Sequence, residues 1–148
     1  MGKYKTANIL LVEDNRMDVE LTLDAFKESK LGNRIDVATS GQEALDYMFG
    51  KGKYENRDDY PLPDIILLDL KMPGIDGHEV LKKIKGEPVL KRLPVIILTS
   101  SKEEGDLLMS YDNGANSYLI KPVSFDGFLD VIKQIEEYWL VLNVNPVI

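Results

Sequence analysis

The chain has 148 residues, enough to bury a sizeable core but too few for two ordinary domains, so we expect a single domain over residues 1–148. Its net charge of −7 argues against nonspecific binding to nucleic acid, which needs clustered lysine and arginine. The lack of cysteine excludes disulfides and thiolate metal sites and fits a cytoplasmic location, and no stretch of the sequence is apolar enough to cross a membrane.

The chain begins with an apolar run, 9–12, that leads directly into the acidic pair Glu13 and Asp14. Such a run without polar alternation indicates a strand buried on both faces. A helical pattern follows from about residue 15 to residue 30, and residues 35–38 form a second short strand.

The next helix has a recognisable start. Ser40 is followed three residues later by Glu43, which is the spacing of a capping box, and the helix is expected to continue to residue 49. The segment 50–63 is rich in glycine, charge, tyrosine and proline, so we expect an exposed loop. This loop is either a tolerated insertion or a surface that recognises a partner.

The stretch 64–77 organises the chain. Its apolar residues 65–68 indicate a third buried strand, which leads directly into Asp69, and the proline and glycine of 72–74 mark its end. In open α/β sheets ligands bind just beyond the carboxyl ends of the strands. We therefore expect Asp69 to lie at the functional edge of the sheet.

The second half of the chain continues the alternation of helices and strands. Further helices are expected at about 77–87, 103–112 and 124–138, and further strands at 95–98 and 117–120. Five strands that alternate with helices predict an α/β fold, in which a five-stranded parallel sheet carries helices on both faces.

Polar side chains of complementary type follow four of the five expected strands. They are Glu13 and Asp14, Asp69, Thr99, and Lys121. Because parallel strands place their carboxyl ends at one edge, these groups should converge. Crowded carboxylates favour a bound divalent cation, and their oxygen ligands suit Mg²⁺. Together with a lysine and a hydroxyl, they are the groups required for phosphoryl transfer onto Asp69.

This ordered set of motifs resembles the receiver domain of two-component response regulators over residues 8–140. The matching segments are 12–15, 64–77, 98–100 and 120–122. The resemblance implies a flavodoxin-like (βα)5 fold with strand order 2-1-3-4-5 and Asp69 as the phosphoacceptor. It also implies that the protein catalyses its own phosphorylation and dephosphorylation without being a conventional enzyme.

The resemblance assigns roles to further residues. It implies that Mg²⁺ is held by Glu13, Asp14, Asp69 and the backbone carbonyl of Lys71. It implies that Thr99 and Lys121 contact the phosphoryl group, and that Tyr118 is the switch residue, whose ring changes rotamer on phosphorylation. It further implies a cis peptide bond between Lys121 and Pro122.

The expected function is that of a stand-alone response regulator that receives its phosphoryl group from a sensor histidine kinase. The long segment 50–63 and the apolar ending resemble the regulators encoded with bacterial phytochromes. The tail 140–148 is too apolar to be left in solvent, so we expect it to pack either against its own domain or against a second subunit. Together with Val131, Ile135 and Tyr138 it favours a homodimer.

Simpler interpretations of the same residues stay open at this point. Asp69 and Thr99 could each cap the segment that follows them. The Glu13–Asp14 pair could simply place favourable negative charge at the start of a helix. Lys121 is compatible with a solvated surface charge, and Tyr118 with ordinary packing in a strand. His78 follows a glycine at a helix start, where we expect an ordinary surface residue.

Other functions are compatible with parts of the pattern. An aspartyl phosphatase would need a second aspartate two residues after the first, where this chain has Lys71. A flavodoxin-like cofactor binder would need a phosphate-binding loop after the first strand. This chain has Glu13 and Asp14 at that place, and their negative charges would repel a phosphate group. An unphosphorylated adaptor with the same fold is the stronger alternative.

Overall fold

Strands and helices alternate along the chain, as the sequence pattern predicts. The computed structural model describes residues 7–28 and 33–142, with side chains as far as Trp139. The strands are β1 (Asn8–Val12), β2 (Arg34–Ala38), β3 (Ile65–Leu68), β4 (Val95–Thr99) and β5 (Ser117–Ile120). All neighbouring strands pair in parallel in the order β2-β1-β3-β4-β5, so the predicted fold and strand order are confirmed.

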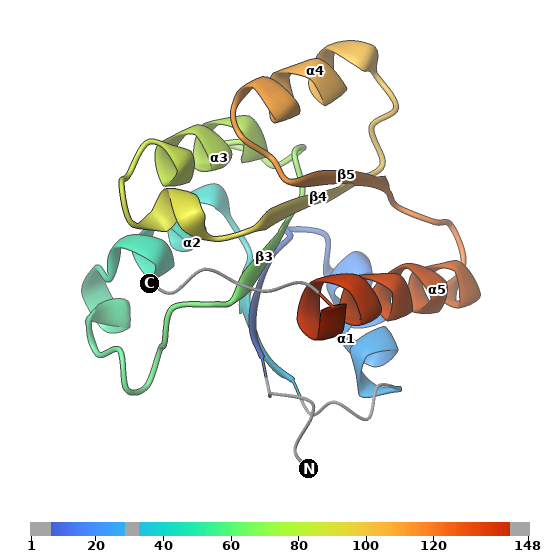
Figure 1. Cartoon of the computed structure of the whole chain (residues 1–148), viewed down its shortest axis with the longest axis horizontal. Helices are drawn as coiled ribbons and strands as arrows, with labels where there is room; N and C mark the ends of the chain where they lie inside the picture. The colour runs from blue at the N-terminus through green and yellow to red at the C-terminus, as the bar shows by residue number, and fades with distance from the viewer. Residues whose placement is uncertain (1–6, 29–32, 143–148) are drawn as a thin grey trace.

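Helices cover both faces of this sheet (Figure 1). On one face lie α1 (Arg16–Lys27) and α5 (Phe125–Ile135), and on the other lie α2 (Gly41–Phe49) and α3 (Gly77–Lys85). The helix α4 (Glu104–Asp112) packs beside α3 and β5. Helix α1 ends before residue 30, at Lys27, with Glu28 as its C-cap.

The apolar runs of the central strands are explained by this two-sided cover. Ile66 and Leu68 of β3 point into the core beneath α2 and α3, whereas Ile65 and Leu67 point into the core beneath α1 and α5. All four side chains are essentially inaccessible to solvent. Burial of each contributes about 1.5–3 kcal/mol, which fixes the position of the strand that leads into the site.

Side-chain caps set the starts of four helices. The caps are Asn15, Ser40, Asp76 and Ser124, each accepting a hydrogen bond from a backbone N–H in the first turn. Ser40 Oγ accepts from the Glu43 N–H at 3.1 Å, as the sequence predicts. The Glu43 carboxylate reaches back to the N–H of Thr39 at 2.7 Å, one residue before the cap.

The segment 50–63 was predicted to be an exposed loop, and this prediction is wrong for the part that packs against the domain. It contains a short 3₁₀ helix, η1 (Gly52–Glu55), whose Tyr54 is buried and donates a hydrogen bond to Glu43 Oε2 at 2.7 Å. Arg57 donates to the carbonyl oxygens of Tyr47 and Met48, which lie at the end of α2. Aromatic packing and these hydrogen bonds attach the segment to α2.

The C-terminal helix provides only part of the exposed apolar patch expected from Val131, Ile135 and Tyr138. After α5 the chain continues as a π-helical segment, η3 (Glu136–Leu142). Ile135 is 2% exposed and packs in the core with α1, so it does not belong to an exposed stripe, whereas Tyr138 is exposed. The remainder of the predicted tail, 143–148, lies outside the described residues.

Two further predictions concern the backbone and the membrane. The described part of the chain has no cis peptide bond, so the Lys121–Pro122 bond is trans and the implied cis bond is not present. Trans is the more stable isomer of an X–Pro bond, by about 0.5–1 kcal/mol. Across residues 7–28 and 33–142, none of the helices has the length and apolar character needed to span a membrane.

Candidate functional site

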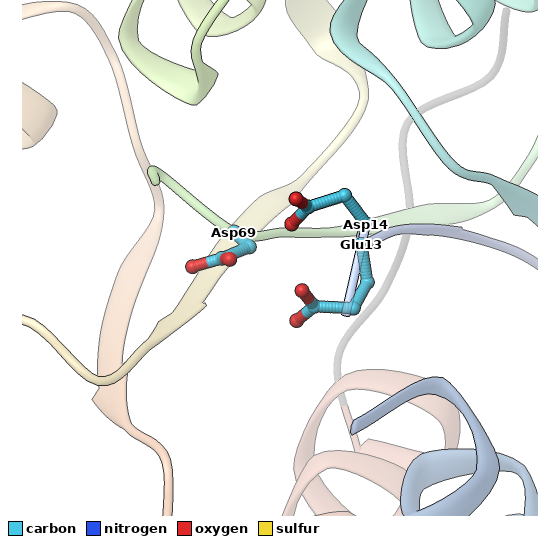
Figure 2. Close-up of side chains that lie close together, drawn as sticks. All are labelled: Glu13, Asp14 and Asp69. Atoms are coloured by element: carbon cyan, nitrogen blue, oxygen red, sulfur yellow. The ribbon is translucent and has the colours of Figure 1, made fainter. Parts of the chain in front are cut away.

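Three carboxylates meet at the carboxyl edge of the sheet. Val12 of β1 lies opposite Leu68 of β3, so the residues that follow the two strands, Glu13 and Asp69, become neighbours. Together with Asp14 they place one oxygen each within 4.8 Å of the others (Figure 2). Glu13 and Asp69 are buried and Asp14 is exposed. The predicted convergence of these residues is therefore observed.

Lys121 lies among these carboxylates. Its Nζ is 2.5 Å from Glu13 Oε1, 2.9 Å from Asp18 Oδ2 and 3.4 Å from Asp69 Oδ2. The Lys121 side chain is only 8% exposed, which rules out a solvated surface charge. Because the lysine follows β5 at the far side of the sheet, only the complete fold brings it to Asp69.

The burial of these charges changes their titration. Burial raises the pKa of the Glu13 carboxyl above its ordinary value, although the hydrogen bond from Lys121 opposes this effect. Burial alone would lower the pKa of the Lys121 ammonium, but hydrogen bonds to Glu13 and Asp18 raise it to about 12. The lysine is therefore a permanent positive charge at the site.

Thr99 and Tyr118 meet at the loop that follows β4. Thr99 is fully buried, and its Oγ1 accepts a hydrogen bond from the N–H of Ser101 at 3.3 Å. The half-buried Tyr118 donates its hydroxyl to the carbonyl oxygen of Ser101 at 3.0 Å. The Lys121 N–H donates to the carbonyl oxygen of Thr99 at 2.8 Å. Ser101 in this loop thus contacts both the threonine and the tyrosine, and the backbone of Thr99 itself contacts the lysine.

The carboxylate cluster fits a hard divalent cation. Its donors are all oxygens, which such ions prefer. Asp69 Oδ1 is buried and has no hydrogen-bond partner among the described residues. A buried charged oxygen without a partner is costly, and a bound cation would satisfy it.

Lys71 and His78 behave differently from a free lysine and a surface histidine. The Lys71 ammonium is 3.0 Å from Asp106 Oδ2, and His78 Nε2 is 2.9 Å from Asp106 Oδ1. The His78 side chain is only 14% exposed, so the predicted surface position is wrong. Ser101 Oγ donates to the same carboxylate at 2.6 Å. Asp106 of α4 therefore connects the loops that follow β3 and β4.

Two residues near the site were not singled out from the sequence. Asp18 lies in the first turn of α1, four residues after Asp14, and this closeness to the acidic pair could have indicated it. A Cβ at Gly77 would lie 2.2 Å from the carbonyl oxygen of Asp69, so only glycine lets α3 approach the acceptor segment this closely. No local sequence signal reveals that approach.

These features define the class of protein. The family model of the response regulator receiver domain matches residues 9–133, and the chain belongs to this family. Receiver domains act in two-component signalling, generally without conventional enzymatic activity, and bind a divalent metal ion.

Individual relatives cover nearly the whole chain. The probable methanogenesis regulatory protein FilR2 of Methanothrix harundinacea (strain 6Ac) is 42% identical over 138 residues, spanning 93% of this chain and 86% of the relative. Response regulator Rcp1 of Synechocystis sp. is 39% identical over 138 residues, spanning 93% of this chain and 92% of Rcp1.

Solved structures agree with this relationship. The phosphorylated cyanobacterial phytochrome response regulator RcpA has a TM-score of 0.91 at 38% identity, over 97% of this chain and 100% of that one. The Mn²⁺-bound form of Rcp1 has a TM-score of 0.87 at 37% identity, over 95% of this chain and 99% of that one. The predicted similarity to phytochrome-associated regulators is therefore confirmed.

Proposed function

We propose that this protein is a stand-alone response regulator whose Asp69 accepts a phosphoryl group from a sensor histidine kinase. The observation that carries the proposal is the unpartnered Asp69 Oδ1, buried at the carboxyl end of β3 beside Glu13, Asp14 and Lys121. A carboxylate oxygen attacks the phosphorus, and the bond from phosphorus to the donor's histidine nitrogen breaks. The products are an aspartyl phosphate and a free histidine.

The site residues have distinct roles in this proposal. Glu13, Asp14, Asp69 and the backbone carbonyl of Lys71 hold Mg²⁺. When bound, Mg²⁺ supplies positive charge that offsets the repulsion between the carboxylates and the phosphoryl oxygens. Lys121 contributes a fixed ammonium, and the Thr99 hydroxyl is available to donate to a phosphoryl oxygen.

Phosphorylation would change the surface near α4 through the loop after β4. Thr99 moves toward the new anion and gives up its contact with Ser101, and the Tyr118 ring turns into the vacated space. The shared contact of both residues with Ser101 supports this coupling. The result is a shift between two arrangements of the surface formed by α4, β5 and α5.

Lys71 is expected to influence the lifetime of the phosphorylated form, because it follows the acceptor Asp69 by two residues and its side chain is largely exposed to solvent. Its ammonium is held by Asp106, so Lys71→Ala removes a charge that restricts water or attracts phosphoryl oxygens. We expect a changed rate of aspartyl-phosphate hydrolysis. A rate equal to the wild type would exclude this role.

The partners follow from the same proposal. RcpA is a phytochrome response regulator, which supports a phytochrome-like histidine kinase as the phosphoryl donor. The whole chain acts as one cytoplasmic receiver domain with its core at residues 8–140 and forms a homodimer through the last helix and the tail. Sedimentation showing only monomer at micromolar concentration would contradict the dimer.

Intact mass after incubation with acetyl phosphate and Mg²⁺ tests the function. One added phosphoryl group is expected, and it should be absent in Asp69→Asn and in the presence of EDTA. If the folded wild-type protein gains no phosphoryl group, the adaptor function replaces the proposed one. The exposed Asp24→Asn variant serves as the matched control and should be phosphorylated normally.

A further inference from the structure

Asp18 on α1 makes a long-range contact with the site. Its Oδ2 accepts a hydrogen bond from Lys121 Nζ at 2.9 Å, across 103 positions of the sequence. The Asp18 side chain is 25% exposed, and the Lys121 side chain 8%, so the pair is largely shielded from solvent. Shielded charge pairs are held more firmly than exposed ones, because water competes with them less.

The other carboxylates around Lys121 could also bind a metal ion. Glu13 and Asp69 belong to the cluster that fits a metal ion, and a cation there would draw their oxygens away from the lysine. Among the described residues, Asp18 is the remaining carboxylate in contact with the Lys121 ammonium. Its oxygens lie outside the metal cluster, so it can keep this contact when the cluster is occupied.

An ammonium group has three N–H donors and a flexible four-carbon stem, so its position depends on its partners. If Asp18 accepts a hydrogen bond from one N–H of the Lys121 ammonium, its other two N–H groups remain available near Asp69. The ammonium nitrogen already lies 3.4 Å from Asp69 Oδ2. From this geometry we infer that Asp18 is a positioning residue that holds Lys121 at the phosphoryl site. The inference rests on the proposed function, because it concerns the same phosphoryl transfer.

Asp18 also has a purely local interpretation. It lies in the first turn of α1, where an acidic side chain interacts favourably with the helix dipole. The N-cap hydrogen bond to Asn15 uses the backbone N–H of Asp18 and does not depend on its side chain. A purely local role would therefore change the stability slightly and leave phosphoryl transfer unchanged.

The test compares Asp18→Ala with Asp18→Asn, because asparagine keeps an oxygen acceptor without the charge. The measured quantity is the rate constant of phosphorylation by acetyl phosphate, with Mg²⁺ saturating for each variant. We expect Asp18→Ala to lower this rate constant by about tenfold or more, because even a small displacement of a positioned group weakens its interaction with the transferring phosphoryl group. Asp18→Asn should stay within about threefold of the wild type, because the acceptor is retained. Asp24→Asn removes the same charge from the same helix and should have no effect.

Two kinetic outcomes would overturn the inference. A wild-type rate in Asp18→Ala would show that Lys121 needs no anchor on α1. Equal losses in the alanine and asparagine variants would show that only the charge of Asp18 matters.

A second measurement does not depend on phosphorylation. In ¹⁵N-lysine-labelled protein with saturating Mg²⁺, which draws Glu13 and Asp69 away from the lysine, the Lys121 ammonium should give a slowly exchanging NMR signal that is retained in Asp18→Asn and lost in Asp18→Ala. Retention in the alanine variant would overturn the positioning role. If the wild-type protein accepts no phosphoryl group, the proposed function fails, and this signal still decides whether Asp18 positions Lys121.

Discussion

The Lys121 ammonium is surrounded by the carboxylates of Glu13, Asp18 and Asp69, and therefore offsets part of a concentrated negative charge. Removing one partner of a buried ion pair leaves the other charge uncompensated. The resulting loss of folding stability is larger than the stability that an exposed ion pair contributes. A divalent cation at the carboxylate cluster would offset the same negative charge. Lysine and cation should therefore substitute for one another electrostatically.

The Lys121→Met variant tests this relationship. Without divalent cations it should lose about 3 kcal/mol of unfolding free energy, because three carboxylates remain close together. Saturating Mg²⁺ should restore more stability in the variant than it adds to the wild type. Urea unfolding with and without Mg²⁺ measures both effects, with the exposed Lys102→Met as the control. An equal gain from Mg²⁺ in both proteins would be inconsistent with this account.

The start of α3 determines where the acceptor segment lies. The Gly77 N–H donates to the carbonyl oxygen of Leu70 at 3.0 Å, and a Cβ added to Gly77 would meet the backbone of Asp69 and Leu70. Backbone cannot move aside as easily as a flexible side chain. Any Cβ at this position would therefore displace either the helix or the acceptor segment.

Gly77→Ala should therefore destabilise the protein by about 2 kcal/mol, in the range of overpacked cores. Gly105→Ala is the matched change, because the added Cβ meets nothing within 4 Å at the start of α4. It should be neutral or stabilising by up to about 1 kcal/mol, since alanine is the better helix former. Urea unfolding of both variants gives the comparison, and similar free energies for the two would disprove the steric argument.

Asp106 links α4 to the loops after β3 and β4. Hydrogen bonds from Ser101 and His78, together with the ion pair to Lys71, hold the pKa of Asp106 well below its ordinary value of 3.8. The folded state therefore binds a proton at this carboxyl more weakly than the unfolded state does. The resulting stabilisation is present above the unfolded pKa and is lost as the pH falls through the folded pKa.

Asp106→Asn should lower the unfolding free energy by about 1–2 kcal/mol at neutral pH, because part of the buried network loses its charged acceptor. The difference from the wild type should narrow below about pH 4, because Asp106 then becomes protonated in the unfolded state while the folded state still holds it ionised. Urea unfolding across this range measures the difference, and the exposed Asp112→Asn on the same helix is the control. A difference that is constant or grows toward low pH would contradict the linkage.

Across the whole molecule, the features that were predictable from the sequence are those that depend on local pattern. Continuous apolar runs mark buried parallel strands, and the polar residue after each run, such as Asp69 or Lys121, is then brought to one edge by the topology. The strand order itself came from the resemblance to receiver domains, because nothing local distinguishes one order of parallel strands from another. The structure confirms it.

The remaining features depend on packing between distant segments. The contact of Asp18 with Lys121, the burial of Tyr54 and the role of Asp106 each require two elements to meet in three dimensions. The prediction that His78 is an ordinary surface residue was wrong for the same reason, because its partner Asp106 lies on another helix. A sequence pattern indicates which face of a helix is apolar, but not which polar group the next element supplies.

The residue that accepts the phosphoryl group can be identified by mapping the modified position. After phosphorylation with acetyl phosphate and Mg²⁺, borohydride reduction converts an aspartyl phosphate to homoserine, which peptide mass analysis locates in the sequence. We expect homoserine at position 69 and at no other position, and none in Asp69→Asn. Homoserine at position 14, or a stable phosphoryl adduct on His78, would contradict the assignment of Asp69 as the acceptor.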